Sequence, residues 1–236
     1  MIPFPALFGR LRRHTSGIAA TEAAFALPFL LGAGLWGLEV ANYAVVNMRV
    51  SQLAFHLADN TSRIGDTSAL ENRKIYEADI TDLMQGADIQ GGRLDLFKNG
   101  RAIISSVEAW DADGNCAEPG DCPASIAQGS QFVHWQRCKG EKAVSPVYGR
   151  EGDPVADGIG PDDRKVAAPD GGAVIFVELH YTYQPLISAR FVTRPDIQAV
   201  AAFVVRDSRD LTGIKQRNPL SPDPVESCGT YDSFAS

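Results

Sequence analysis

The feature that most constrains this chain is an apolar run that covers residues 18–46. As a helix this run would extend about 43 Å, whereas a bilayer core of about 30 Å needs roughly 20 residues. After Ala23 only Glu39 places a charge in it. Glu39 lies near the point where the helix should leave the lipid, so we expect a solvated acid at the membrane surface, and a second assembly contact is the alternative. We therefore expect a helix that crosses a membrane at about residues 20–46, and a buried core helix is the alternative that the pattern leaves open.

A short basic segment, residues 1–17, precedes the apolar run and contains Arg10, Arg12 and Arg13 but no acid. It lacks the apolar core that a cleaved secretory signal peptide has before its cleavage site. By the positive-inside rule this leader lies in the cytoplasm, and the body of the chain then lies outside it.

The charge of the body excludes one class of partner. The whole chain has a net charge of −7 although its leader is basic, so the body alone is more acidic still. Binding to nucleic acid depends on an excess of Lys and Arg that displaces phosphate counterions. We therefore expect no nucleic-acid partner.

The helical pattern continues past the apolar run and becomes amphipathic. Apolar residues recur at helical spacing, at Val50, Leu53, Ala54, Leu57 and Ile64. They predict one long helix over residues 18–65, followed by an extracytoplasmic domain over residues 66–236. A second helix is predicted at about residues 68–84, with Asp66 or Thr67 as its cap and Gly86 at its end.

Beyond residue 92 the residue types favour strands, because β-branched and aromatic side chains gather in short runs. Asn99-Gly100 has the composition of a hairpin turn between the first two runs. The pattern predicts an α+β fold, in which a mostly antiparallel sheet of four to five strands packs on the C-terminal half of the long helix. The predicted strands are 93–97, 102–110, 131–138, 173–183 and 197–206.

All four cysteines, Cys116, Cys122, Cys138 and Cys228, follow the apolar run. An even number on one side of a membrane favours two disulfides in an oxidising compartment, and three pairings are possible. Cys116 and Cys122 lie in one Gly/Pro/Asp-rich loop, which favours a bond between them and leaves Cys138 for Cys228. A structural zinc site is the alternative, but no CxxC pair is present.

Few residues favour catalysis. No GxSxG, HExxH or Walker sequence occurs. His134 and Cys138 resemble a base and a nucleophile, yet a disulfide is the more common use of such a cysteine outside the cytoplasm. The acidic loop 151–163 lacks the ligand spacing of an EF-hand. We expect neither an enzyme nor a metal or cofactor site.

The start of the apolar run carries the most specific motif. Gly17 is followed by Ile18, and Glu22 comes five residues after Gly17 at the head of the apolar segment. The stretch 16–47, SGIAATEAAFALPFLLGAGLWGLEVANYAVVN, resembles the N-terminal motif of the TadE-like family, the minor pseudopilins of the tight-adherence (Flp) pilus system. The pieces HWQRCKG, VIFVELHYTYQPL and AAFVVRD also resemble extracytoplasmic parts of this family. Ala23 stands where the family usually has Tyr or Phe.

The resemblance implies a function. A prepilin peptidase would cut after Gly17 and leave Ile18 as the mature N-terminus, and Glu22 would serve recognition or assembly. The partners would be this peptidase, other pseudopilins, pilus assembly proteins and the lipid bilayer of the bacterial inner membrane, which the chain would cross once. The alternative is an uncleaved, membrane-anchored periplasmic module that binds a ligand with its loops 111–130 and 140–172.

Overall fold

The computed structural model describes residues 16–65, 72–110, 129–206 and 209–234. The chain forms two compact units, Met1–Ala44 with Pro185–Thr193 and Val45–Gln184 with Arg194–Ser236. The fold is α+β, with a long N-terminal apolar helix packed on an antiparallel sheet. This confirms the fold class that the sequence predicts.

The long helix is α2, Ser16–Arg63, which continues without a break through Pro28. Its bounds agree with the predicted helix to within two residues. In the second unit, Val50, Ala54, Leu57 and Ala58 are buried along one side of it. The amphipathic spacing seen in the sequence therefore marks the side of α2 that packs in the core.

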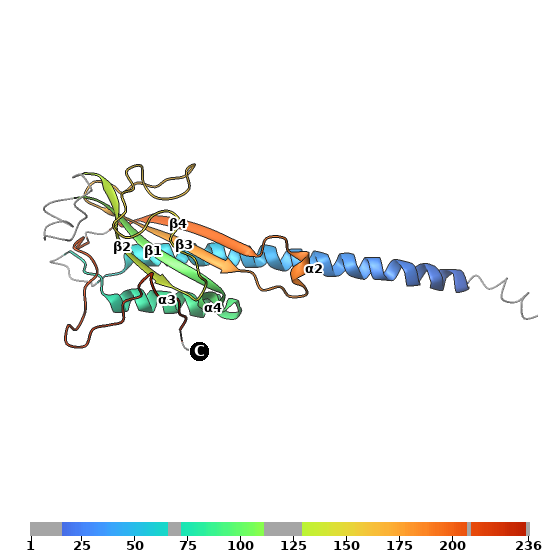
Figure 1. Ribbon diagram of the computed structural model, residues 1–236. Coiled ribbons are helices and arrows are strands. Elements are labelled where there is room, and N and C mark those ends of the chain that lie inside the picture. Colours follow the sequence, from blue (N-terminus) through green and yellow to red (C-terminus); the bar gives the residue numbers. More distant parts are fainter. Residues whose placement is uncertain (1–15, 66–71, 111–128, 207–208, 235–236) are drawn as a thin grey trace, which may run out of the picture. The chain divides into compact units, whose positions relative to one another are not determined.

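The sheet has four strands in the order β2-β1-β3-β4, and every neighbouring pair is antiparallel (Figure 1). Four of the five predicted strands are confirmed, with ends shifted by at most two residues. The bounds are β1 Gly100–Ala109, β2 Gln131–Lys139, β3 Ala173–Thr182 and β4 Asp196–Val204.

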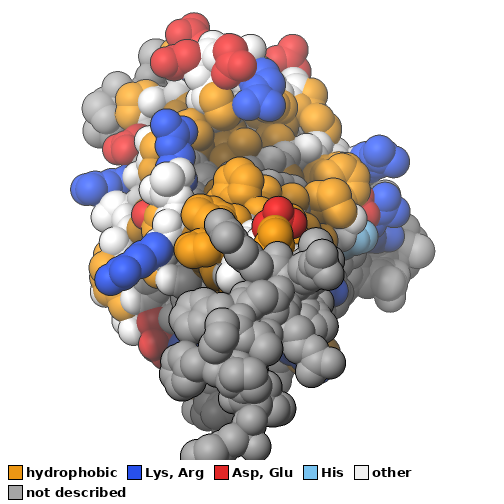
Figure 2. Space-filling view, turned by 90° about the vertical axis from the view of Figure 1, so that its right-hand side faces the viewer, with side chains coloured by type: hydrophobic (Ala, Val, Ile, Leu, Met, Phe, Trp, Pro, Cys, Tyr) orange, Lys and Arg blue, Asp and Glu red, His pale blue; other side chains and the backbone are white. Residues whose placement is uncertain are grey.

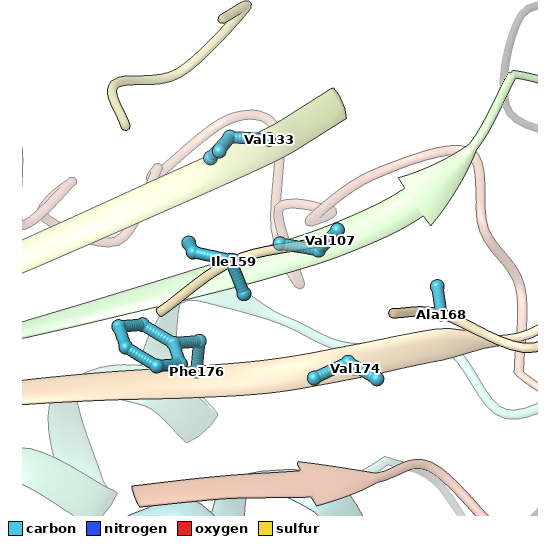
Figure 3. Packing of buried hydrophobic residues seen from close by; sticks show 6 residues of the cluster. All are labelled: Val107, Val133, Ile159, Ala168, Val174 and Phe176. Atoms are coloured by element: carbon cyan, nitrogen blue, oxygen red, sulfur yellow. The ribbon is translucent and has the colours of Figure 1, made fainter. Parts of the chain in front are cut away.

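One face of the sheet is covered by the segment between β2 and β3. Val107 lies opposite both Val133 and Val174, so the three share one face. Ile159 and Ala168 from the covering segment complete an apolar cluster with Phe176 (Figure 3). This segment is therefore part of the core, although its sequence is rich in Gly, Pro and acid.

The opposite face packs on helices. Phe55 of α2 meets Phe203 of β4 edge to face, with ring centroids 4.8 Å apart. Helix α3 (Glu77–Gly91) buries Ile80 and Met84. Strand residues alternate between the two faces, and nearly every residue of the central strands β1 and β3 is buried. Both faces of these two strands are therefore covered.

The predicted strand at 93–97 and its hairpin turn are wrong. The chain instead forms a 3-10 turn η1 (Gly92–Leu94) and the short helix α4 (Leu96–Asn99). The Asn99 side chain donates to the carbonyl of Leu94, which closes this turn locally. Gly100 is the first residue of β1. A Cβ at this position would lie 2.6 Å from the His180 carbonyl oxygen, so the close approach of the backbone explains why the residue is glycine.

The bounds predicted for the second helix are also wrong. Of that prediction, residues 66–71 lie outside the described part of the chain, and α3 begins only at Glu77. The Asp79 carboxylate accepts a hydrogen bond from the Tyr76 backbone N–H and so fixes the start of α3. Gly86 lies inside α3, and the helix ends before Gly92, whose φ of 52° suits glycine.

Candidate functional site

The motif at the start of the apolar run lies on the first two turns of α2. Gly17 and Ile18 are exposed helical residues, and Glu22 is exposed beside them. The Thr21 hydroxyl donates to the Ile18 carbonyl oxygen of the preceding turn at 2.8 Å. The structure thus brings Gly17, Ile18 and Glu22 together on one helix end, whereas most of the basic leader lies outside the described residues.

The apolar part of α2 is unusually accessible. Every residue from 17 to 38 is exposed, including large side chains such as Phe25 (77%) and Phe29 (79%). The helix is long and apolar enough to span a membrane, with a mean hydropathy of 1.6. Such an apolar surface needs lipid or other apolar helices around it, which is consistent with a single-pass membrane protein.

Glu39 ends this exposed stretch and is completely buried. Its carboxylate accepts hydrogen bonds from three consecutive backbone N–H groups, those of Leu186 (3.0 Å), Ile187 (2.6 Å) and Ser188 (3.3 Å). The sequence alone favours a solvated acid at the membrane surface for Glu39, and this is wrong. The acid instead holds the Pro185–Thr193 segment against the helix within the first unit.

Arg101 is another completely buried charge, and the sequence does not single it out. Its guanidinium donates to the carbonyl oxygens of Gly140 (2.8 Å), Cys228 (2.9 Å) and Thr230 (2.8 Å). It also lies 4.1 Å over the ring of Tyr231. Burial lowers the pKa of Arg101 from its ordinary value, although Tyr231 and Asp232 oppose this. Arg101 thus fastens the C-terminal tail to the sheet.

The tail is fastened a second time by a disulfide between Cys138 and Cys228. This is the pairing that the sequence favours for these two residues. Beside it, Lys139 contacts Glu226 and Asp232, both at 2.9 Å. Burial opposes the Lys139 charge, but these two acids outweigh it and raise the pKa of Lys139. Cys116 and Cys122, the other expected pair, lie outside the described residues.

The candidate catalytic pair does not exist in this arrangement, because the Cys138 sulfur is consumed by the disulfide. His134 is instead paired with Glu108, with Nδ1 2.8 Å from Oε2, and Ser106 donates to the other oxygen of that carboxylate at 2.7 Å. The carboxylate therefore stands between Ser106 and His134, whereas a catalytic histidine would contact the hydroxyl itself. We interpret this buried trio as a structural network.

One pocket in the second unit has a volume of about 560 Å³. In its wall Arg137 is already paired, because it binds Glu77 with two nitrogens and lies 3.6 Å from Glu151. Among the described residues no group of three or more His, Cys, Asp or Glu is placed to hold a metal ion. The pocket is lined by Gln136, Arg137, Ser145, Pro146, Arg150, Glu151, Val225, Ser227 and Cys228.

No family model, curated protein or solved structure matches this chain. On the face drawn in Figure 2, basic side chains are interspersed with acidic ones. Two features distinguish the molecule. One is its exposed apolar helix with the motif at its start, and the other is the pair of completely buried charges, Glu39 and Arg101, that bind backbone groups distant in the sequence.

Proposed function

We propose that this protein is a TadE-like minor pseudopilin, a structural component in the assembly of a tight-adherence (Flp-type) pilus. In this proposal a prepilin peptidase removes the leader after Gly17. The chain is anchored in the bacterial inner membrane with its leader in the cytoplasm, and the second unit is presented on the other side. Its partners are the peptidase, other pseudopilins and further pilus assembly proteins.

The observation that carries the proposal is the position of the motif. Gly17, Ile18 and Glu22 lie on the exposed beginning of an apolar helix whose residues 17–38 are all exposed. A peptidase can reach such a site only where the chain itself does not cover it. The apolar surface beyond it is suited first to lipid and then to the helices of neighbouring subunits.

Cleavage would give Glu22 a partner. The new amine of Ile18 would be a positive charge next to lipid, and the carboxylate of Glu22 is a costly negative charge in the same place. If the carboxylate of one subunit binds the amine of the next, the attraction between the two charges offsets the cost of removing each from water. The pair would favour parallel helices with an axial stagger. Gly32, Gly34 and Gly37 leave open space along α2, where another helix can approach closely.

Replacement of Glu22 tests this role. In a strain that builds the pilus, Glu22→Ala is expected to reach the membrane in normal amount but to be incorporated into pili several-fold less. Glu22→Asp, which keeps the charge, is expected to restore part of the incorporation. Asp82→Asn, at an exposed acid of α3, serves as the matched control. Normal incorporation of Glu22→Ala would contradict the pairing.

A second candidate is an uncleaved anchor that carries a ligand-binding module, and the 560 Å³ pocket favours it. Its wall includes Ser145, Arg150 and Glu151 from the loop in which the sequence places ligand binding. The chemical state of the N-terminus separates the two candidates, because only the pseudopilin loses its leader.

A further inference from the structure

The segment Pro185–Thr193, which joins β3 to β4, is held by its backbone rather than by its side chains. Three successive N–H groups, those of Leu186, Ile187 and Ser188, converge on the Glu39 carboxylate. Backbone groups arranged in this way form a concave anion site, and here the anion is supplied by the chain itself. The Ser188 hydroxyl then accepts from the Arg190 N–H at 3.3 Å and begins the 3-10 turn η2, Ala189–Phe191.

Where the backbone faces Glu39, the side chains of Leu186 and Ile187 turn outward. Leu186 is 64% exposed and Ile187 is 37% exposed. Arg190 is exposed in the same segment. Two apolar side chains and one cation are therefore presented together, and the bond to Glu39 fixes their level along the helix.

That level coincides with the end of the continuously exposed apolar stretch at residue 38, so we take the span to end there rather than at the predicted residue 46. Residues 18–38 extend about 31 Å at about 1.5 Å per residue, which matches a hydrocarbon core of about 30 Å. Glu39 is the next residue. Trp36, 54% exposed, stands one turn earlier, and tryptophan is enriched where lipid chains meet the headgroups.

We propose that the Pro185–Thr193 segment is a second membrane contact, which lies on the bilayer surface at the Glu39 end of the span. Leu186 and Ile187 enter the boundary between headgroups and acyl chains, and Arg190 binds the phosphate of an anionic phospholipid. Apolar side chains next to a cation are the composition by which peripheral segments bind such a surface. The bilayer is the chosen occupant because this patch continues the exposed apolar surface of α2. The proposal depends on α2 crossing the membrane and not on the pilus role.

The contact can be tested in the full-length protein in nanodiscs of phosphatidylcholine and phosphatidylglycerol. In a background of Cys116→Ser and Cys122→Ser, an environment-sensitive fluorophore is attached to Leu186→Cys. Leu220→Cys, at a leucine that is 96% exposed in the second unit, is the matched control, and Trp36→Cys reports the span itself. We expect lipids with a nitroxide near the headgroup to quench the Leu186 probe several-fold more than the Leu220 probe.

Removal of phosphatidylglycerol, or Arg190→Gln, is expected to reduce that quenching. Equal quenching at positions 186 and 220, with the Trp36 probe quenched, would overturn the proposal while leaving the membrane span and leader cleavage intact. A Leu186 probe that is shielded only in the assembled pilus would also overturn it, because the occupant would then be a protein.

Discussion

The Glu39 carboxylate lies 2.6 Å from the backbone nitrogen of Ile187, a residue 148 positions later in the chain. This bond joins the end of the apolar stretch of α2 to the connection between β3 and β4. A buried carboxylate is stable when several hydrogen bonds favour its charged form, and here three backbone groups supply them.

The first prediction concerns this contact. Glu39→Gln keeps the shape of the side chain but removes the charge, and its amide nitrogen cannot accept a hydrogen bond. Weakening such bonds costs about 1–3 kcal/mol, which raises local opening by about fivefold to a hundredfold. We expect hydrogen exchange of the Leu186, Ile187 and Ser188 amides in the full-length protein to accelerate accordingly. Asp82→Asn, at an exposed acid, should leave these amides unchanged, and unaltered exchange in Glu39→Gln would show that the carboxylate does not hold the segment.

The second prediction concerns Arg101. Arg101→Ala leaves the carbonyl oxygens of Gly140, Cys228 and Thr230 without their donor, so we expect a loss of about 3 kcal/mol in the free energy of unfolding. Arg101→Lys should be intermediate, because an ammonium cannot reach the three oxygens as the planar guanidinium does. Thermal unfolding in detergent measures both. The control is Arg164→Ala at an exposed arginine, and equal stability of the Ala variants at 101 and 164 would contradict the role given to Arg101.

The third prediction is a pH dependence. Burial raises the pKa of Tyr181 to about 12, and its hydroxyl donates to the Leu94 carbonyl oxygen at 3.0 Å. In the unfolded chain tyrosine loses its proton near pH 10, so between about pH 10 and 12 only the unfolded state ionises. Stability that is fully present below about pH 10 should therefore fall by about 2 kcal/mol across that window.

Tyr181→Phe isolates this effect. The variant should lose about 1 kcal/mol at neutral pH with its hydrogen bond, but its stability should fall less steeply above about pH 10. Lys139, whose pKa is also raised, contributes to the alkaline loss in both proteins and cancels in the comparison. Chemical unfolding at a series of pH values gives the two curves, and parallel curves would exclude Tyr181 as the cause.

The long helix and four strands follow from the sequence because their signals are local. Helical spacing at Val50, Ala54 and Leu57 and the β-branched runs of β1 and β3 report which side chains are buried. The error at 93–97 has a local cause too: Leu94, Leu96 and Phe97 are apolar as in a strand, but they are buried in tight turns that the Asn99 side chain closes. Hydrophobicity shows that these residues are inside and does not show the backbone path that brings them there.

The candidate site divides in the same way. The Gly17–Glu22 motif is visible because its residues are adjacent, and the Cys138–Cys228 bond because cysteines are few. Glu39 and Arg101 acquire their roles only from backbone groups that are distant in the sequence. Leu186 lies 147 residues after Glu39, and Thr230 lies 129 residues after Arg101. For Glu39 the sequence does contain a signal, because a lone acid stands near the end of an apolar run. No sequence pattern near Arg101 indicates its role.

The central claim, that this chain is a processed pseudopilin, is tested most directly by the mass of its N-terminus. The full-length chain is expressed with an active prepilin peptidase of a tight-adherence system and, in parallel, with a catalytically inactive form of that peptidase. Gly17→Val, which places a bulky side chain at the cut, serves as a substrate control. With the active peptidase we predict a mature chain that begins at Ile18. With the inactive peptidase, and for Gly17→Val with the active peptidase, we predict an intact leader. An intact leader in the presence of the active peptidase would contradict the account and favour the uncleaved anchor.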